Sequence, residues 1–261
     1  DLHSTSRRQR QMCIRDSIQS MANVSTMDTE AAVAQAIRMI EAGAEYVRFT
    51  AQGEREARNL GEIRKQLNEQ GYTTPLVADI HFNPRAADAA AGEVEKVRIN
   101  PGNYVDKVKT FSHLEYTDEE YAAEIEKIRE RFVPFLNICK AHGTAIRIGV
   151  NHGSLSDRIM SRYGDTPEGM VASCMEFLRI CREENFPDVV ISIKASNTVV
   201  MVRTVRLLVR TMEAENMHYP LHLGVTEAGD GEDGRIKSAV GIGTLLCDGI
   251  GDTIRVSLSE D

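Results

Sequence analysis

The chain has 261 residues, of which 42% are hydrophobic and 5% aromatic, so it can form one large α/β domain with a mainly aliphatic core. Its net charge of −8 argues against non-specific nucleic-acid binding, which requires a basic face. Its 5 cysteines form no CxxC pair, which argues against a disulfide framework, and no apolar run approaches the roughly 18 residues of a membrane span.

Residues 1–16 are rich in arginine and have no apolar periodicity. A basic targeting segment would be followed by an apolar stretch, and none follows here. We interpret residues 1–16 as a non-native or disordered leader and residues 17–261 as the folded part of the chain.

From Ile18 onward, short β-branched runs alternate with segments that have the apolar spacing of amphipathic helices. We predict strands at residues 18–21, 46–50, 75–81, 96–100, 145–151, 188–194, 221–225 and 253–258. We predict helices at residues 28–42, 54–70, 84–91, 118–142, 167–184, 198–214 and 235–247. We expect a loop at 101–117 and a glycine-rich loop at 229–234. We also expect Pro134 to interrupt the helix at 118–142.

This alternation of eight strands with helices implies parallel strands joined by crossover helices. A count of eight favours closure into a TIM-type (β/α)8 barrel, and an open doubly wound sheet is the alternative. The chain ends just after the eighth predicted strand, where a final barrel helix or a further domain is expected. We therefore interpret the sequence as a barrel truncated before a further domain.

Several predicted strands end in a cation with polar residues beside it. The cations are Arg48, Arg98, Arg147 and Lys194, and the polar residues are Asn100, Asn151 and Ser196. The carboxyl ends of barrel strands meet at one rim, where ligands bind. A single strand-end arginine usually forms a solvated salt bridge, but repetition on neighbouring strands predicts a cationic mouth for an anionic, phosphorylated small molecule.

Acidic residues and glycines also lie at the predicted rim. Asp79 and His81 share one face of their strand, where they could be metal ligands, an acid–base residue with its orienting partner, or a pair that closes the strand end. Glu227 could act as a general acid or base, or lie on the surface. The loop at 229–234 leaves backbone N–H groups for an anion, although ordinary turns use the same glycines.

Two further pairs are predicted to be structural. Cys174 and Cys181 are seven residues apart and should share a buried helix face, whereas Gly241 and Gly243 should serve close packing in a helix. No nucleophile elbow, Walker loop, Rossmann fingerprint or zinc-finger spacing is present.

Long motifs in the chain resemble those of one known family. They are Ile18–Met21, Pro75–Phe82, Val97–Asn103, Ile146–Leu155, Leu221–Gly229 and Gly251–Leu258. Over essentially all of residues 18–261 the chain closely resembles the 4-hydroxy-3-methylbut-2-enyl diphosphate synthase family. Its insert at 104–135 is similar to the longer forms of plants and some bacteria.

The resemblance implies an iron–sulfur oxidoreductase of non-mevalonate isoprenoid biosynthesis. Its barrel binds 2-C-methyl-D-erythritol 2,4-cyclodiphosphate, which is reductively opened and dehydroxylated. A separate C-terminal domain holds a 4Fe-4S cluster on three cysteines and one glutamate, so no metal ligand is expected within this chain. Ferredoxin or flavodoxin supplies electrons, and the enzyme is a homodimer.

The resemblance also implies roles for individual residues. The diphosphate would be held by Arg48, His81, Arg98, Arg147 and Lys194, with hydrogen bonds from Asn100, Asn151 and Ser196 and with Arg255 at the rim. Asp79 would orient His81, and Glu227 would lie near the hydroxyl that leaves. Without the cluster domain, the chain is expected to bind substrate and not to turn it over.

Three alternatives remain open at this stage. One is a pterin-binding barrel of the dihydropteroate synthase type, and another is a non-catalytic module that presents substrate to a separate cluster domain. A metal-dependent hydrolase using Asp79 and His81 is weaker, because only His152 and His222 are available to extend a metal shell. We expect no nucleic-acid or membrane partner, and the bacterial cytoplasm rather than the plastid stroma.

Overall fold

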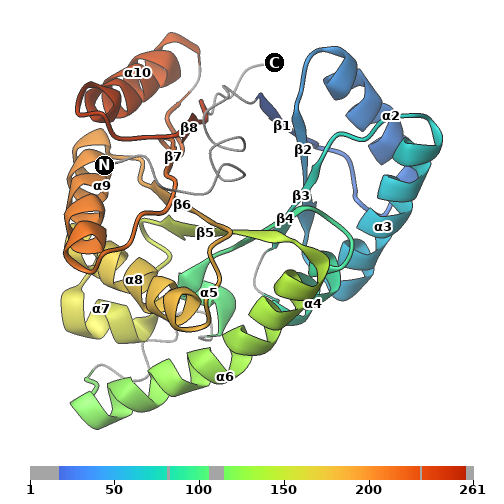
Figure 1. Ribbon diagram of the computed structural model, residues 1–261. Coiled ribbons are helices and arrows are strands. Elements are labelled where there is room, and N and C mark those ends of the chain that lie inside the picture. The colour runs from blue at the N-terminus through green and yellow to red at the C-terminus, as the bar shows by residue number, and fades with distance from the viewer. Residues whose placement is uncertain (1–17, 81–82, 106–114, 230, 257–261) are drawn as a thin grey trace.

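The computed structural model describes residues 18–80, 83–105, 115–229 and 231–256. Its strands are β1 Gln19–Met21, β2 Tyr46–Ala51, β3 Leu76–Ile80, β4 Lys96–Ile99, β5 Ala145–Asn151, β6 Val189–Lys194, β7 His222–Leu223 and β8 Thr253–Ile254. The first six form a parallel sheet in chain order, and the last two form a parallel pair. The strands curl around a common centre with the helices outside (Figure 1).

Backbone contacts between β6 and the segment around β7 join the two sheets. Leu221 forms an isolated parallel bridge with Ile191 of β6, and the Ile191 amide donates to the Pro220 carbonyl oxygen at 2.9 Å. The eight strands therefore follow one another around the centre in chain order. Among the described residues no ladder pairs β8 with β1, so this part of the chain forms a curled, incompletely closed barrel.

The sequential strand order confirms the barrel and excludes the doubly wound alternative. A doubly wound sheet reverses its strand order near the middle, whereas β1 to β6 run in order without reversal. The helices also lie on the outer side of the curl (Figure 1). The inner side is therefore reserved for side chains that alternate inward along each strand.

The helices mostly match the predicted segments to within a few residues. They are α2 Thr29–Glu41, α3 Glu54–Glu69, α4 Pro84–Ala91, α5 Pro101–Tyr104, α6 Asp118–His142, α7 Asp157–Tyr163, α8 Pro167–Glu183, α9 Thr198–Ala214 and α10 Gly231–Cys247. Asp28 caps α2 by accepting from the Ala31 amide at 3.1 Å, and Thr117 forms a capping box with Glu120 on α6. None of the helices in the described ranges is long and apolar enough to cross a bilayer.

Several predicted boundaries were wrong. The short helices α5 and α7 were not predicted, because they are too short to show a helical period. Pro134 lies inside an uninterrupted α6, where the burial of Phe132 and Phe135 offsets the lost backbone hydrogen bond. The glycine-rich segment forms the first turn of α10 rather than a loop, and β7 and β8 are only two residues long.

An aromatic cluster anchors the insert between β4 and β5 to the rest of the barrel. The Tyr104 ring of α5 lies 5.8 Å from the Phe132 ring of α6 and 6.0 Å from the Phe177 ring of α8, both edge-on. Cys174 and Cys181 are both fully buried on α8, as predicted. The insert is thus packed against the barrel through α6, and the turn that follows β4 is fixed by the same cluster.

Candidate functional site

The predicted cations lie side by side on the inner face of the curled sheet. Asp79, Arg98 and Arg147 are register partners on β3, β4 and β5, and Arg48 comes from the neighbouring β2. All are buried, with exposed fractions of 5% for Arg48, 1% for Asp79, 6% for Arg98 and 3% for Arg147. Such burial is unusual for charged groups and requires partners or a function.

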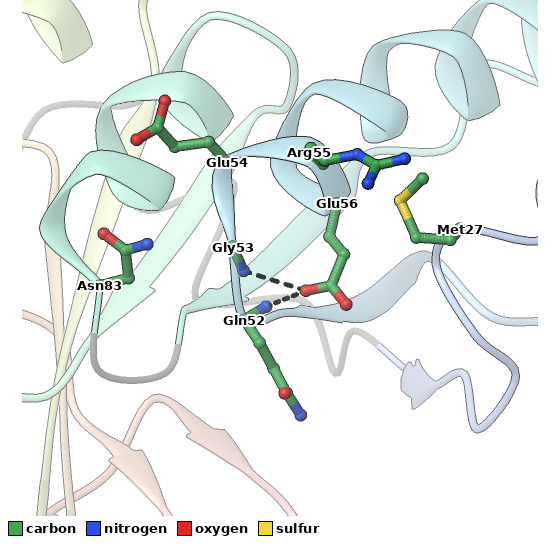
Figure 2. Close-up of a pocket in the computed structure, with 7 residues that line it drawn as sticks. All are labelled: Met27, Gln52, Gly53, Glu54, Arg55, Glu56 and Asn83. Carbon is green, nitrogen blue, oxygen red and sulfur yellow. Dashed lines mark hydrogen bonds between the residues drawn. The ribbon is translucent and has the colours of Figure 1, made fainter.

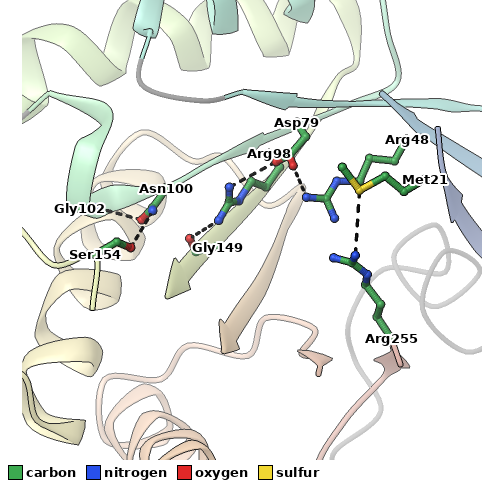
Figure 3. Close-up of polar contacts among 9 residues, drawn as sticks. All are labelled: Met21, Arg48, Asp79, Arg98, Asn100, Gly102, Gly149, Ser154 and Arg255. Atoms are coloured by element: carbon green, nitrogen blue, oxygen red, sulfur yellow. Dashed lines mark hydrogen bonds and ion pairs between the residues drawn. The ribbon is translucent and has the colours of Figure 1, made fainter. Parts of the chain in front are cut away.

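Asp79 is the counter-ion of two of these arginines. Its Oδ2 forms an ion pair with Nη2 of Arg48, and its Oδ1 lies 3.3 Å from Nη1 of Arg98 (Figure 3). Arg98 also donates from Nη2 to the Gly149 carbonyl oxygen at 3.1 Å. Gly149 is required there, because an added Cβ would lie 2.6 Å from Nε of Arg98. Asp79 therefore fixes both guanidinium groups.

Arg147 has no such neutralising partner among the residues that the structure describes. Its Nε and Nη1 are buried without a hydrogen-bond acceptor in this part of the chain. Burial lowers the pKa of Arg147 well below its ordinary value, and the positive charges of Arg48 and Arg98 lower it further. Buried donors without acceptors cost roughly 1–3 kcal/mol each, which indicates a site prepared for an anion.

Lys194 and Arg255 extend the cationic site from β6 to the end of β8. Lys194 ends β6, and burial together with the charge of Arg147 lowers its pKa well below the ordinary value. Arg255 follows β8, is half-buried, and has a pKa lowered by burial and by Arg48. Nη2 of Arg255 lies 4.0 Å from Sδ of Met21, which brings the end of β8 next to β1 (Figure 3).

His222 lies among these cations, although the sequence suggested it only as a possible addition to a metal shell. It lies buried on β7, with Nδ1 2.7 Å from Oγ1 of Thr253 and with Nε2 buried and unpartnered in the described structure. Burial and the charges of Arg147 and Lys194 lower the pKa of His222 well below 6.5. The alternation His222-x-Gly224 on the seventh strand could have identified it as inward-facing.

Asn100 and Asn151 lie at the rim, joined through Ser154. Asn100 caps α5 by accepting from the Gly102 amide at 3.2 Å, and its Nδ2 donates to Oγ of Ser154 at 3.0 Å (Figure 3). Oγ of Ser154 donates to the carbonyl oxygen of Asn151 at 3.1 Å. A Cβ on Gly102 would lie 1.7 Å from the Ser154 carbonyl oxygen, so only glycine permits this approach. The Asn100 amide thus organises the rim.

The remaining predicted residues lie farther out or outside the described ranges. Ser196 and Glu227 are exposed, and Glu227 has a φ of 50°, a left-handed conformation uncommon for glutamate. Among described residues, neither has a hydrogen bond or ion pair to the buried cations. His81 and the predicted leader, residues 1–16, lie outside the described residues. Gly229 and Gly231 both have positive φ beside the start of α10.

A hollow of about 620 Å³ lies outside the cation cluster. Its lining is Met27, Gln52, Gly53, Glu54, Arg55, Glu56 and Asn83, from the segments that follow β1, β2 and β3 (Figure 2). Oε2 of Glu56 accepts from the backbone amide of Gly53 at 3.0 Å, so this carboxylate caps α3. None of the buried cations lines this hollow.

The described residues give no support to a metal site. In this part of the chain, no three side chains of His, Cys, Asp or Glu are grouped as they would be around a metal ion. Asp79 is instead engaged by two arginines. Burial raises the pKa of Cys139 to about 12 and raises those of Cys174 and Cys181 as well, which disfavours the thiolate that metals require.

Comparison with solved structures identifies the fold. The chain is similar to 3-dehydroquinate dehydratase from Geobacillus kaustophilus, with a TM-score of 0.55 and 10% identity over 95% of this chain and 84% of that one. It is equally similar to D-allulose 3-epimerase from Methylomonas, with a TM-score of 0.55 and 14% identity over 94% and 85% of the two chains. At such identities the likeness concerns the fold alone.

Sequence comparison identifies the family. The chain is 76% identical over 243 residues to a protein of Bacteroides thetaiotaomicron and 77% identical over 243 residues to one of Phocaeicola vulgatus, both named 4-hydroxy-3-methylbut-2-en-1-yl diphosphate synthase (flavodoxin). Each match covers 93% of this chain and 40% of the relative, so the chain spans less than half the length of these relatives. The family profile described as GcpE TIM-barrel domain matches residues 14–261, and the chain therefore belongs to the GcpE TIM-barrel domain family.

Proposed function

We propose that this chain is the substrate-binding barrel of a 4-hydroxy-3-methylbut-2-enyl diphosphate synthase. The whole enzyme is an oxidoreductase that opens and dehydroxylates 2-C-methyl-D-erythritol 2,4-cyclodiphosphate. The observation that carries the proposal is the group of buried cations around Arg147, whose guanidinium has donors without acceptors in the described structure. Isolated buried charge is costly to a fold, and a bound diphosphate would neutralise it.

The charges and donors of the site match a diphosphate. Arg48 and Arg98 share the one carboxylate of Asp79, while Arg147 and Lys194 have no ion pair in the described ranges. Guanidinium forks match phosphate oxygens in geometry, and lysine supplies a point charge. In this proposal, Arg147 and Lys194 grip the diphosphate, and Arg48 and Arg98 present the faces that Asp79 leaves free.

The outer residues complete the proposed site. Asn151 and Ser196 lie at the rim, where they would bond to the substrate, and Asn100 would act chiefly by holding the Ser154 loop. His81 would add a further contact to the diphosphate and Glu227 would approach the hydroxyl that leaves. The pairing of Asp79 with Arg48 and Arg98 supports a role in positioning these arginines, beside its proposed role in orienting His81.

The redox chemistry of the proposed enzyme would come from outside this barrel. The buried thiols of Cys139, Cys174 and Cys181 have raised pKa values and do not fit a cluster site. We propose that a separate C-terminal domain holds the 4Fe-4S cluster and that flavodoxin or ferredoxin supplies electrons. Assembly as a homodimer in the bacterial cytoplasm belongs to the same proposal. The barrel itself would bind and orient the cyclic diphosphate.

Calorimetric titration of the chain with 2-C-methyl-D-erythritol 2,4-cyclodiphosphate tests the proposal. The chain should bind without turnover, and binding should weaken as salt is raised. Arg147→Ala should weaken binding roughly tenfold to hundredfold, because a charge-assisted contact contributes about 1.5–3 kcal/mol. The control Arg58→Ala, an exposed position on α3, should bind as the parent does.

Three results would contradict the proposal. If the Arg147→Ala variant bound the cyclic diphosphate as tightly as the parent, the cation cluster would not be the binding site. Binding of a pterin with no response to the cyclic diphosphate would favour the pterin-binding barrel. Full turnover by the chain alone would contradict the proposal that the barrel binds substrate and a separate domain supplies the redox chemistry.

A further inference from the structure

The side chain of Lys194 is held in one place by its surroundings. It ends β6, is 8% exposed, and faces Asn151 in the register of the β5–β6 ladder. It packs against Gly224, the residue after β7, where an added Cβ would lie 3.3 Å from Cε and 3.6 Å from Nζ of the lysine. Gly224 therefore leaves the room that the lysine amine occupies, and the flexible stem is fixed by packing.

The charges that act on Lys194 come from several strands around the curl. They are Arg48 on β2, Arg98 on β4, Arg147 on β5, His222 on β7 and Arg255 after β8. The carboxylate of Asp79 pairs with Arg48 and Arg98. The side-chain amine of Lys194 has no hydrogen bond or ion pair to any residue in the described ranges. Its amine is thus surrounded by positive charge without a counter-ion of its own.

A buried lysine beside other cations is a known arrangement for an amine nucleophile. We propose that Lys194 forms a reversible imine with small phosphorylated aldehydes and ketones that enter the cationic site. This inference rests on the anion site proposed above, because the phosphate of the compound must be held by Arg147 and Arg48. It assigns Lys194 a covalent reactivity in addition to electrostatic contact.

The proposed reaction needs no oxidant, reductant or further reactant. The neutral amine nitrogen attacks the carbonyl carbon and forms a C–N bond. The carbonyl oxygen leaves as water with the two amine hydrogens, and a C=N bond remains. Water reverses the reaction, so phosphorylated carbonyl compounds would occupy the site as reversible covalent competitors of the cyclic diphosphate.

The electrostatics of the site support this reactivity. Burial first, and the charges of Arg147 and Arg255 next, lower the pKa of Lys194 well below the ordinary value. Each unit by which a lysine pKa falls raises the fraction of neutral amine about tenfold at a pH below both values. Lys194 should therefore react at a pH at which exposed lysines are almost wholly protonated.

Pyridoxal 5′-phosphate is a suitable probe, because it joins an aldehyde to a phosphate in one small molecule. The chain is incubated with the probe at neutral pH, the imine is reduced with borohydride, and the modified lysines are located by peptide mass mapping. Pyridoxal, which lacks the phosphate, is the matched control compound. Lys194→Gln and Lys65→Gln, the latter at an exposed position on α3, are the matched variants.

We expect Lys194 to be modified at least about tenfold faster than Lys65, and at least about tenfold faster by pyridoxal 5′-phosphate than by pyridoxal. Arg147→Ala should slow the modification of Lys194, and Lys65→Gln should leave it unchanged. An unmodified Lys194 in parent protein whose exposed lysines are modified would overturn the inference. Mapping of the parent protein decides this even where Lys194→Gln fails to fold.

A calorimetric titration with the cyclic diphosphate separates the two proposals. Binding of the cyclic diphosphate together with an unmodified Lys194 would overturn the imine alone. If Lys194 is modified while the cyclic diphosphate neither binds to the chain nor slows the modification, the imine is supported and the proposed function is contradicted.

Discussion

At the residue scale, Asp79 accepts ion pairs from arginines on both strands that flank β3. Asp79→Asn should lower the free energy of unfolding by about 3–5 kcal/mol, because it leaves two buried guanidinium groups without a counter-ion. Added pyrophosphate should restore more stability to this variant than it adds to the parent. Urea unfolding with and without pyrophosphate measures both effects.

The control for this prediction is Asp248→Asn. Asp248 pairs with Arg206 on the surface, where such a pair contributes about 0–1 kcal/mol. If Asp79→Asn were no less stable than Asp248→Asn, the ion pairs of Asp79 would not stabilise the buried arginines.

His222 gives the site a predicted pH dependence. Its folded-state pKa is lowered well below 6.5, so between these two values the unfolded chain binds a proton that the folded chain does not. Stability should therefore fall as the pH drops below 6.5, by at most about 1.4 kcal/mol per pH unit from this group.

His222→Gln should reduce that loss. Urea midpoints at several values of pH between 7.5 and 5.5 test this, with His142→Gln, on the outer helix α6, as the control. Parallel pH profiles for the parent and His222→Gln would contradict it.

The sequence predicted which cations face inward but not what pairs with them. Strand-end position was enough to place Arg48, Arg98, Arg147 and Lys194 on one face, because alternation along parallel strands is strict. The pairing of Asp79 with two arginines depends on which strands are neighbours. That information lies in the tertiary structure, as does the capping role of Asn100 at the start of α5.

At the scale of elements, periodicity predicted the long helices and the central strands. It missed the helices α5 and α7, because a helix of four or seven residues spans two turns or fewer. The strands β7 and β8 were predicted, but each is shorter than expected. Prediction failed at Pro134 because tertiary packing of α6 outweighs the local preference of proline. Short elements therefore need contact information that a single sequence does not contain.

Helix α10 offers a matched pair of glycines. A Cβ at Gly241 would lie 2.9 Å from Cε of Met201 and 2.9 Å from Cγ2 of Val225, whereas at Gly243 it would meet nothing within 4 Å. Close packing is thus confirmed for Gly241 and wrong for Gly243. Gly243→Ala should raise the free energy of unfolding by about 1 kcal/mol, and Gly241→Ala should lower it by about 1 kcal/mol.

Chemical denaturation of the two variants measures this difference. Equal gains in stability from both substitutions would mean that α9 and α10 are not packed as closely as Gly241 indicates.

At the scale of the whole molecule, the proposed binding site spans two sheets that are joined by few backbone contacts, at Ile191 and at Ala195. The first sheet carries Arg48, Arg98 and Arg147, while Arg255 follows the last strand of the second sheet. An anion that contacts both groups should hold the sheets together. At a ligand concentration of 100 times Kd, binding should add about 2.7 kcal/mol of stability.

Hydrogen exchange locates that stabilisation. With ligand, amide protection should increase at β7 and β8 as well as in the first sheet. Protection confined to β2 through β6 would mean that the ligand does not engage the second sheet.

We propose that the fold retains its buried cations for an anion, at a cost in stability. Arg147 and Arg158 are both 3% exposed, but Arg158 pairs with Glu176 at 2.5 Å whereas Nε and Nη1 of Arg147 have no acceptor among the described residues. Replacing an unpaired buried charge with an apolar side chain should stabilise the fold, and breaking a buried pair should cost about 3–5 kcal/mol.

The measurement is the unfolding free energy of Arg147→Met and Arg158→Met, each with and without 2-C-methyl-D-erythritol 2,4-cyclodiphosphate. We predict that Arg147→Met is more stable than the parent without ligand and gains little from it, while Arg158→Met is less stable and retains the ligand-dependent gain. An Arg147→Met variant that is destabilised and still gains the full stabilisation from the ligand would contradict the account.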